Sequence, residues 1–183
     1  MLTTGTAKPL TTGNDGSSRV PETGDEFVVW AVLCFTAWFL MLILVPLREL
    51  KRLWPAAIIG MAAVYAVDST LIGLGAFSYA RAGPALSGVP LFYLLSVAAA
   101  TVPLAYHYPD GARRQAVFVA AAALVFLLVE AAMVALRYFH HLSWSLWRSY
   151  LLDVGGFIVV LWLARLAGAA GRHPAAGRTP VEP

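Results

Sequence analysis

The chain consists of five long apolar runs separated by short polar segments. The runs cover residues 27–47, 53–77, 89–106, 116–136 and 150–166. About 20 apolar residues let a helix cross a hydrocarbon core of about 30 Å. Backbone groups in lipid must bond within the chain, so each run is expected to be a helix, and unbroken apolar runs do not fit the alternating strands of a β-barrel. The pattern predicts an all-α membrane protein, a bundle of five transmembrane helices.

Polar segments at both ends set the boundaries of the predicted membrane domain. Residues 1–26 and 167–183 are rich in Gly, Pro, Ser, Thr and Ala, with few large apolar residues, and are predicted to be disordered tails. The last apolar run is short for a span, so we expect its helix to begin near residue 146. The predicted domain is therefore 27–166, with helices at 27–47, 53–77, 89–106, 116–136 and 146–166.

Composition supports a membrane protein and excludes several other classes. Hydrophobic residues make up 60% of the chain and charged residues only 13%, about half the share in soluble domains. The basic residues bracket the apolar runs and form no patch, which argues against binding of nucleic acid. A single cysteine, Cys34, rules out a disulfide framework and a zinc ribbon.

The basic residues also predict an orientation. With five spans the two termini lie on opposite sides of the membrane. The side that holds the N-terminal tail carries five basic residues, namely Lys8, Arg19, Arg81, Arg137 and Arg148. The other side carries eight, namely Arg48, Lys51, Arg52, Arg113, Arg114, Arg165, Arg172 and Arg178. Basic loops stay in the cytoplasm, so we expect the N-terminus outside and the C-terminus inside.

Three acids interrupt the apolar runs: Asp68, Glu130 and Asp153. A charge in the bilayer costs several kcal/mol, so such an acid normally faces the interior of the bundle and has a partner. Counted from the ends of their helices, all three lie in the outer half of the membrane. We expect them to converge on one ligand-binding or proton-relay site; separate interhelical hydrogen bonds are the alternative.

The segment "RYFHHLSWSLWRSYLLD", residues 137–153, adds polar and aromatic groups on the same side. If the fourth helix continues past residue 136, then Glu130, Arg137 and His141 share one helix face, and Arg137 and His141 join the candidate site. Glu130 could pair with Arg137, and Asp153 with Arg148. Trp144, Trp147 and Tyr150 are expected to be interfacial anchors.

No catalytic, cofactor or metal signature is found. The chain lacks the Walker, GxGxxG, HExxH and GxSxG motifs. Adjacent His140 and His141 point about 100° apart on a helix and cannot both bind one metal there. Lys8 and Lys51 are the only lysines, and neither lies in a span, which excludes a retinal Schiff base. We therefore assign no catalytic residue, no metal and no cofactor.

Several landmarks follow one another along the apolar runs. These are "RLWP" at the start of the second run, Asp68 late in it, "GVPLFYLLSVAAATVPLAYHYP" in the third, and "WSLWRSYLLDVGGF" leading into the last. In this order they resemble a family of small multi-pass membrane proteins found mainly in spore-forming bacteria. The resemblance covers about residues 52–166. It implies a bacterial plasma-membrane protein and adds no activity, because the family has no established one.

Three functions remain open. The first is a non-enzymatic bundle whose outer polar cluster binds a partner protein, a second copy, a lipid or a small ligand. The second is a small transporter or proton-coupled carrier that uses Asp68, Glu130 and Asp153 as a relay. The third is a membrane enzyme acting on a lipid or isoprenoid, with carboxylates as acid and base. The absence of catalytic and cofactor motifs favours the non-enzymatic bundle. The lipid bilayer is its expected surroundings.

Overall fold

Five helices and four short strands form the part of the chain described by the computed structural model, residues 23–80 and 83–171. The helices are α1 (Thr23–Leu44), α2 (Leu47–Gly73), α3 (Leu91–His107), α4 (Ala112–Ala135) and α5 (Leu146–Leu166). The strands are β1 (Phe77–Tyr79), β2 (Ala85–Leu86), β3 (Val89–Pro90) and β4 (Phe139–His141). The expected all-α class and its five helices are thus found.

Four of the helices, α1, α2, α4 and α5, are long and apolar enough to cross a membrane, whereas α3 has 17 residues. Their outward side chains are large and apolar, including Phe35, Leu128 and Trp162, each more than half exposed. In water such surface would be costly. Facing hydrocarbon, it is the expected exterior of a membrane protein.

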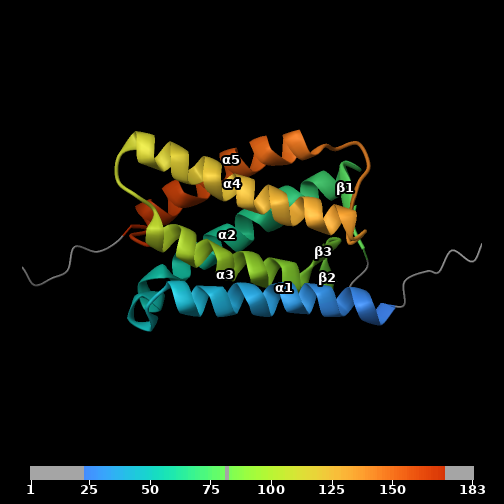
Figure 1. The fold of residues 1–183 in the computed structure, drawn as a ribbon, viewed down its shortest axis with the longest axis horizontal. Helices are drawn as coiled ribbons and strands as arrows, with labels where there is room; N and C mark the ends of the chain where they lie inside the picture. Colours follow the sequence, from blue (N-terminus) through green and yellow to red (C-terminus); the bar gives the residue numbers. More distant parts are fainter. Residues whose placement is uncertain (1–22, 81–82, 172–183) are drawn as a thin grey trace, which may run out of the picture.

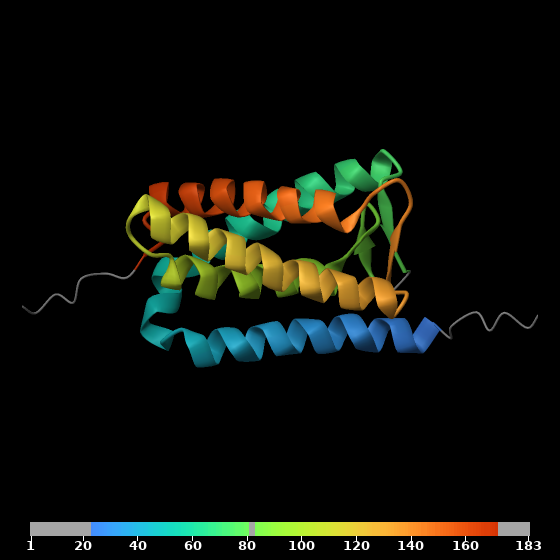
Figure 2. The ribbon, with the colours of Figure 1, turned by 45° about the horizontal axis from the view of Figure 1, so that its top comes forward.

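The helix α3 lies at the centre of the bundle and packs against both α1 and α2, while α5 packs against α2 and α4 (Figures 1 and 2). One reason for the close contact of α2 with α3 is Gly60, because a Cβ there would collide with the side chain of Thr101. The outer helix α1 packs mainly on α3, with far less contact to α4. This leaves a separation between α1 and α4 that matters for the site.

The helix α2 begins at Leu47, six residues earlier than expected. The polar stretch before residue 53 contains strong helix formers, and Arg52 is bonded to Glu49 at 3.0 Å within it. Arg52 also donates to the carbonyls of Gly168, at 3.3 Å, and Gly171, at 2.8 Å. These contacts hold the basic segment as a helix against the end of α5.

Short strands at one end of the bundle were not expected from the sequence. β1 pairs antiparallel with β4, with Phe77 opposite His141 and Tyr79 opposite Phe139, and β2 pairs with β3 as a hairpin. Phe77 and residues 89–90, which we placed in helices, therefore lie on strands, and Leu136 lies just beyond the end of α4. The remaining helix ends differ from the expected ones by one to four residues, except that α5 matches.

The predicted tails fall largely outside the described residues. Residues 1–22 and 172–183 are not described, so the prediction of disorder is not tested there. Residues 23–26, expected in the tail, have helical backbone. Residues 167–171 are ordered too: Ala169 is fully buried, and the Gly171 N–H donates to the Ala105 carbonyl at 2.8 Å.

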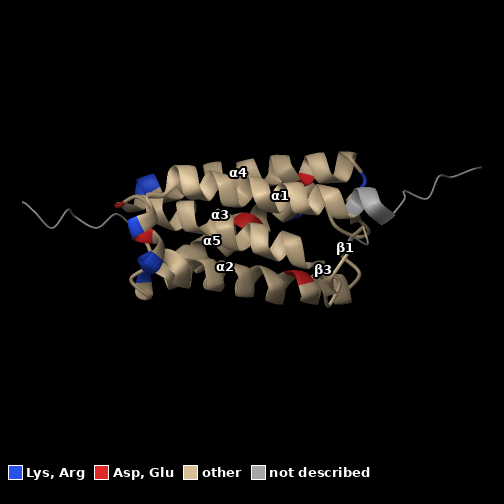
Figure 3. Ribbon diagram, turned by 90° about the horizontal axis from the view of Figure 1, so that it is seen from below, with Lys and Arg blue, Asp and Glu red and all other residues tan. Residues whose placement is uncertain are grey.

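Basic residues gather at one end of the bundle (Figure 3). The starts of α2 and α4 and the end of α5 meet there, and among the described residues these carry Arg48, Lys51, Arg52, Arg113, Arg114 and Arg165. At the opposite end, where β1 and β4 lie, the described basic residues are Arg137 and Arg148. We call the first the basic end and the second the strand end.

Candidate functional site

The three acids of the apolar helices all face the interior of the bundle. Asp68 comes from α2, Glu130 from α4 and Asp153 from α5, and each lines a cavity between the helices. Asp68 is only 7% exposed. Asp153 is close enough to Glu130 and Asp68 for their charges to interact. The structure therefore brings together the three carboxylates that we selected from their depth in the sequence.

Asp68 accepts a hydrogen bond from a strand. The Tyr79 hydroxyl, on β1, donates to Asp68 Oδ2 at 2.5 Å. Removal from water among the rings of Trp30, Tyr93 and Phe139 raises the pKa of Tyr79 well above its ordinary value. The phenol therefore keeps its proton and remains a donor, which ties β1 to the middle of the bundle.

Glu130 is the centre of a second network. Its Oε1 accepts a hydrogen bond from the Ser149 hydroxyl at 2.6 Å and lies 2.8 Å from His141 Nε2. Ser149 in turn accepts a hydrogen bond from the Trp144 indole N–H at 2.9 Å. The network joins α4, β4 and the start of α5, and it connects the strand end to the interior.

Asp153 differs from the other two acids. Within residues 23–80 and 83–171, no side chain or backbone group donates a hydrogen bond to it; Asp68 and Glu130 each have donors. Its nearest basic neighbour in sequence, Arg148, donates instead to the Ser143 carbonyl at 2.9 Å and lies over the Trp144 ring. Asp153 is thus a carboxylate with unused acceptor capacity.

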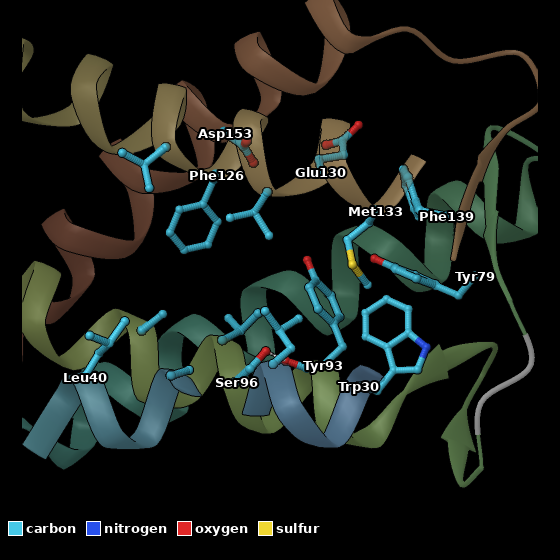
Figure 4. Close-up of a pocket in the computed structure, with 16 residues that line it drawn as sticks. Trp30, Leu40, Tyr79, Tyr93, Ser96, Phe126, Glu130, Met133, Phe139 and Asp153 are labelled. Carbon is cyan, nitrogen blue, oxygen red and sulfur yellow. Dashed lines mark hydrogen bonds between the residues drawn. The ribbon is translucent and has the colours of Figure 1, made fainter. Parts of the chain in front are cut away.

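A cavity of about 240 Å³, the larger cavity, lies between α1, α3 and α4 (Figure 4). Its walls are almost entirely apolar, and Asp153 and the Tyr93 hydroxyl point into it from opposite sides. Three of its lining residues, Leu40 on α1 and Val125 and Val129 on α4, are exposed on the outside of the bundle. The larger cavity therefore opens sideways between α1 and α4.

A second cavity of about 100 Å³, the smaller cavity, lies between α2, α3, α4 and α5. It contains Asp68 and Asp153 and the rings of Tyr93, Phe126 and Phe157. Four residues line both cavities: Tyr93, Val97, Phe126 and Asp153. The two spaces therefore meet at these four side chains.

Other sequence expectations for this region are only partly met. The α4 helix ends at Ala135 and Arg137 is exposed in a turn, so Glu130, Arg137 and His141 do not share a helix face. His141 still reaches Glu130, because β4 folds back along the bundle. The interaction expected between Glu130 and Arg137 is not formed, nor is the one between Asp153 and Arg148.

The three expected anchors also differ from one another. Trp147 is 66% exposed and stacks on Tyr150 with ring centroids 5.8 Å apart, as an interfacial pair would. Trp144 is half-buried and bonded to Ser149, so it belongs to the Glu130 network. Sequence reasoning gave Tyr93 only a role in helix packing, and it missed Tyr79, Phe126 and Ser149.

No metal site is found in the described part of the chain, where no three His, Cys, Asp or Glu residues come together in a way that could hold an ion.

Compared with known proteins, the chain matches no family model, and neither a curated protein nor a solved structure is significantly similar to it. The resemblance to membrane proteins of spore-forming bacteria therefore stays a prediction.

Proposed function

We propose that the chain is a five-span protein of the bacterial plasma membrane that binds an amphiphile with an apolar chain, taken sideways from the bilayer. The observation that carries this is the larger cavity: an apolar space with an apolar mouth between α1 and α4 and a few polar groups at its inner wall. Ligand pockets commonly have this composition, with polar groups that fix the orientation of the ligand. No catalytic residue is assigned.

The proposal includes α3 as the fifth span. At about 1.5 Å per residue its 17 residues reach about 26 Å, slightly less than the hydrocarbon core. The hairpin of β2 and β3 extends the segment at the strand end. Because α1 and α2 cover α3 on two sides, most of its backbone faces protein, where a short helix is tolerated.

The orientation follows from the distribution of basic residues. Among the described residues the basic end carries six arginines and lysines and the strand end carries two. The positive-inside rule places the basic end in the cytoplasm. The three acids and the strands then lie in the outer half, with the N-terminus outside and the C-terminus inside.

The test uses a 16-carbon alcohol that carries a photoreactive diazirine on its chain. In nanodiscs, irradiation should label residues that line the larger cavity, such as Leu33 and Ala100. Mass spectrometry of the cross-linked peptides identifies the labelled residues. Ala100→Phe fills the cavity and should reduce this labelling at least about five-fold. Ala62→Phe, on the exposed face of α2, is the matched control and should leave it unchanged.

Labelling restricted to the outward faces of the helices, or equal labelling in Ala100→Phe, would reject the proposal.

A carrier is the second candidate, and the observation that favours it is that Asp153 lines both cavities. A carrier would move the amphiphile between leaflets after reconstitution, whereas a binding protein would only retain it.

A further inference from the structure

We infer that the smaller cavity binds the ammonium group of a single-chain alkylamine whose chain lies in the larger cavity. This inference rests on the proposed function and names the chemical class of its ligand. The two cavities meet at Val97 and at the polar and aromatic side chains of Tyr93, Phe126 and Asp153, so a chain that enters between α1 and α4 brings its polar end to that junction.

The carboxylates of the smaller cavity are the first feature that selects a cation. Asp68 and Asp153 both line it, and Asp153 has no hydrogen-bond donor among the described residues. No arginine or lysine lines either cavity. An acid within a membrane-spanning segment normally has a partner, and an ammonium group supplies both the opposite charge and the hydrogen-bond donors that Asp153 lacks.

The aromatic rings are an independent second feature. Tyr93, Phe126 and Phe157 line the same small space, and the rings of Phe126 and Phe157 meet edge to face with centroids 4.9 Å apart. Faces of aromatic rings attract cations within about 6 Å, and such cages recognise ammonium groups. The negative faces of these rings would repel a carboxylate, and a neutral alcohol would gain less from them than a cation.

The same geometry argues against a phospholipid as the ligand. A phosphate attached close to the ammonium would lie beside Asp153 and within the field of Glu130 and Asp68, whose charges already interact. Like charges at close range are unfavourable. The ligand class is therefore an amine without an adjacent phosphate.

The experiment measures displacement of the photoreactive 16-carbon alcohol from the full chain in zwitterionic nanodiscs by three competitors of equal chain length: hexadecylamine, hexadecanol and hexadecylphosphocholine. For the wild type we expect half-displacement at a concentration at least about ten-fold lower for the amine than for the alcohol. The phosphocholine should be no better than the alcohol. The selectivity ratio is the half-displacement concentration of the alcohol divided by that of the amine. This ratio is compared across variants, because partitioning of the competitors into the lipid is the same for all of them.

Asp153→Asn and Phe126→Leu should each lower that ratio at least about three-fold, and labelling by the alcohol probe shows that the variants are folded. Asp110→Asn, whose side chain is 95% exposed at the basic end, is the control and should keep the wild-type ratio. If the alcohol probe no longer labels the Asp153→Asn variant, the ratio measured for Phe126→Leu alone tests the inference.

The inference is overturned by a wild-type ratio near one, or by a ratio that neither variant lowers. In both cases the proposed function stands as long as the alcohol probe labels the larger cavity and Ala100→Phe prevents this. Absence of cavity labelling by the probe in the wild type would reject both.

Discussion

Ser149 is the residue through which the strand end is joined to the interior acids. It is buried, donates to Glu130 and accepts from Trp144. Ser149→Ala removes the acceptor of the Trp144 indole N–H and one of the donors to Glu130. We therefore expect the free energy of unfolding to fall by about 1–2 kcal/mol. Titration with SDS in mixed micelles measures this free energy of unfolding.

Ser143→Ala is the matched control, because the Ser143 hydroxyl bonds the Gly75 carbonyl in an exposed loop. Its effect should stay within about 0.5 kcal/mol. The double variant Ser149→Ala with Glu130→Gln should lose less than the sum of the single losses, because Ser149→Ala removes the same hydrogen bond that Glu130→Gln weakens by replacing a charged acceptor with a neutral amide. Strict additivity would mean that Ser149 and Glu130 contribute independently and are not coupled through this hydrogen bond.

At the scale of the elements, three helices end in the same motif. After α2, α4 and α5 the chain turns left-handed at Gly75, Arg137 and Gly168, each with φ between 65° and 70°. Each turn carries the paired backbone bonds of a Schellman cap, for example from the Tyr138 N–H to the Met133 carbonyl at 2.9 Å. Two of the caps have glycine at the left-handed position, whereas α4 has arginine.

Arg137→Gly should therefore stabilise the protein. A residue with a Cβ is strained in the left-handed region by about 1–2 kcal/mol, and part of that gain is offset by the extra freedom of glycine in the unfolded chain. We expect a net gain of about 0.5–1 kcal/mol in the same SDS titration. The mirror control, Gly75→Ala, should lose about 1 kcal/mol; a gain there, or a loss in Arg137→Gly, would contradict the role given to these caps.

The same caps explain where the sequence was and was not informative. Gly168 follows the predicted end of the last helix at 166, whereas the predicted second helix ran past the stop signal at Gly75 to residue 77. Nothing in "LRYFHH" marks Arg137 as a left-handed residue. The fourth helix therefore seemed able to continue to His141. His141 reaches Glu130 by a different path, through β4, so this residue was placed near the correct partner for the wrong reason.

For the whole molecule, hydropathy predicted the features that the surrounding lipid imposes, namely the number of helices and the inward position of the acids. Five apolar runs became five helices, and the cost of an acid in hydrocarbon pointed to Asp68, Glu130 and Asp153 facing inward. Contacts between distant segments were not predictable. The three-residue strands β1 and β4 lie about 60 residues apart, and their pairing, together with the position of Tyr79 at Asp68, follows from the packing of the helices.

The orientation of the whole molecule is a last testable prediction. In a Cys34→Ala background, which removes the only cysteine, a single cysteine is introduced by Ser143→Cys at the strand end or by Asp110→Cys at the basic end. Both positions are exposed. In intact cells a membrane-impermeant maleimide should label the Ser143→Cys protein if the strand end faces outward, as proposed.

The Asp110→Cys protein should be labelled only after the membrane is permeabilised. The reverse pattern would place the basic end outside, against the positive-inside rule, and would move the three acids to the cytoplasmic half. The mouth of the larger cavity would remain between α1 and α4 in that case, because the lateral opening does not depend on orientation. The leaflet from which the polar end of an amphiphile approaches Asp153 would change, and with it the side of the membrane that supplies the ligand.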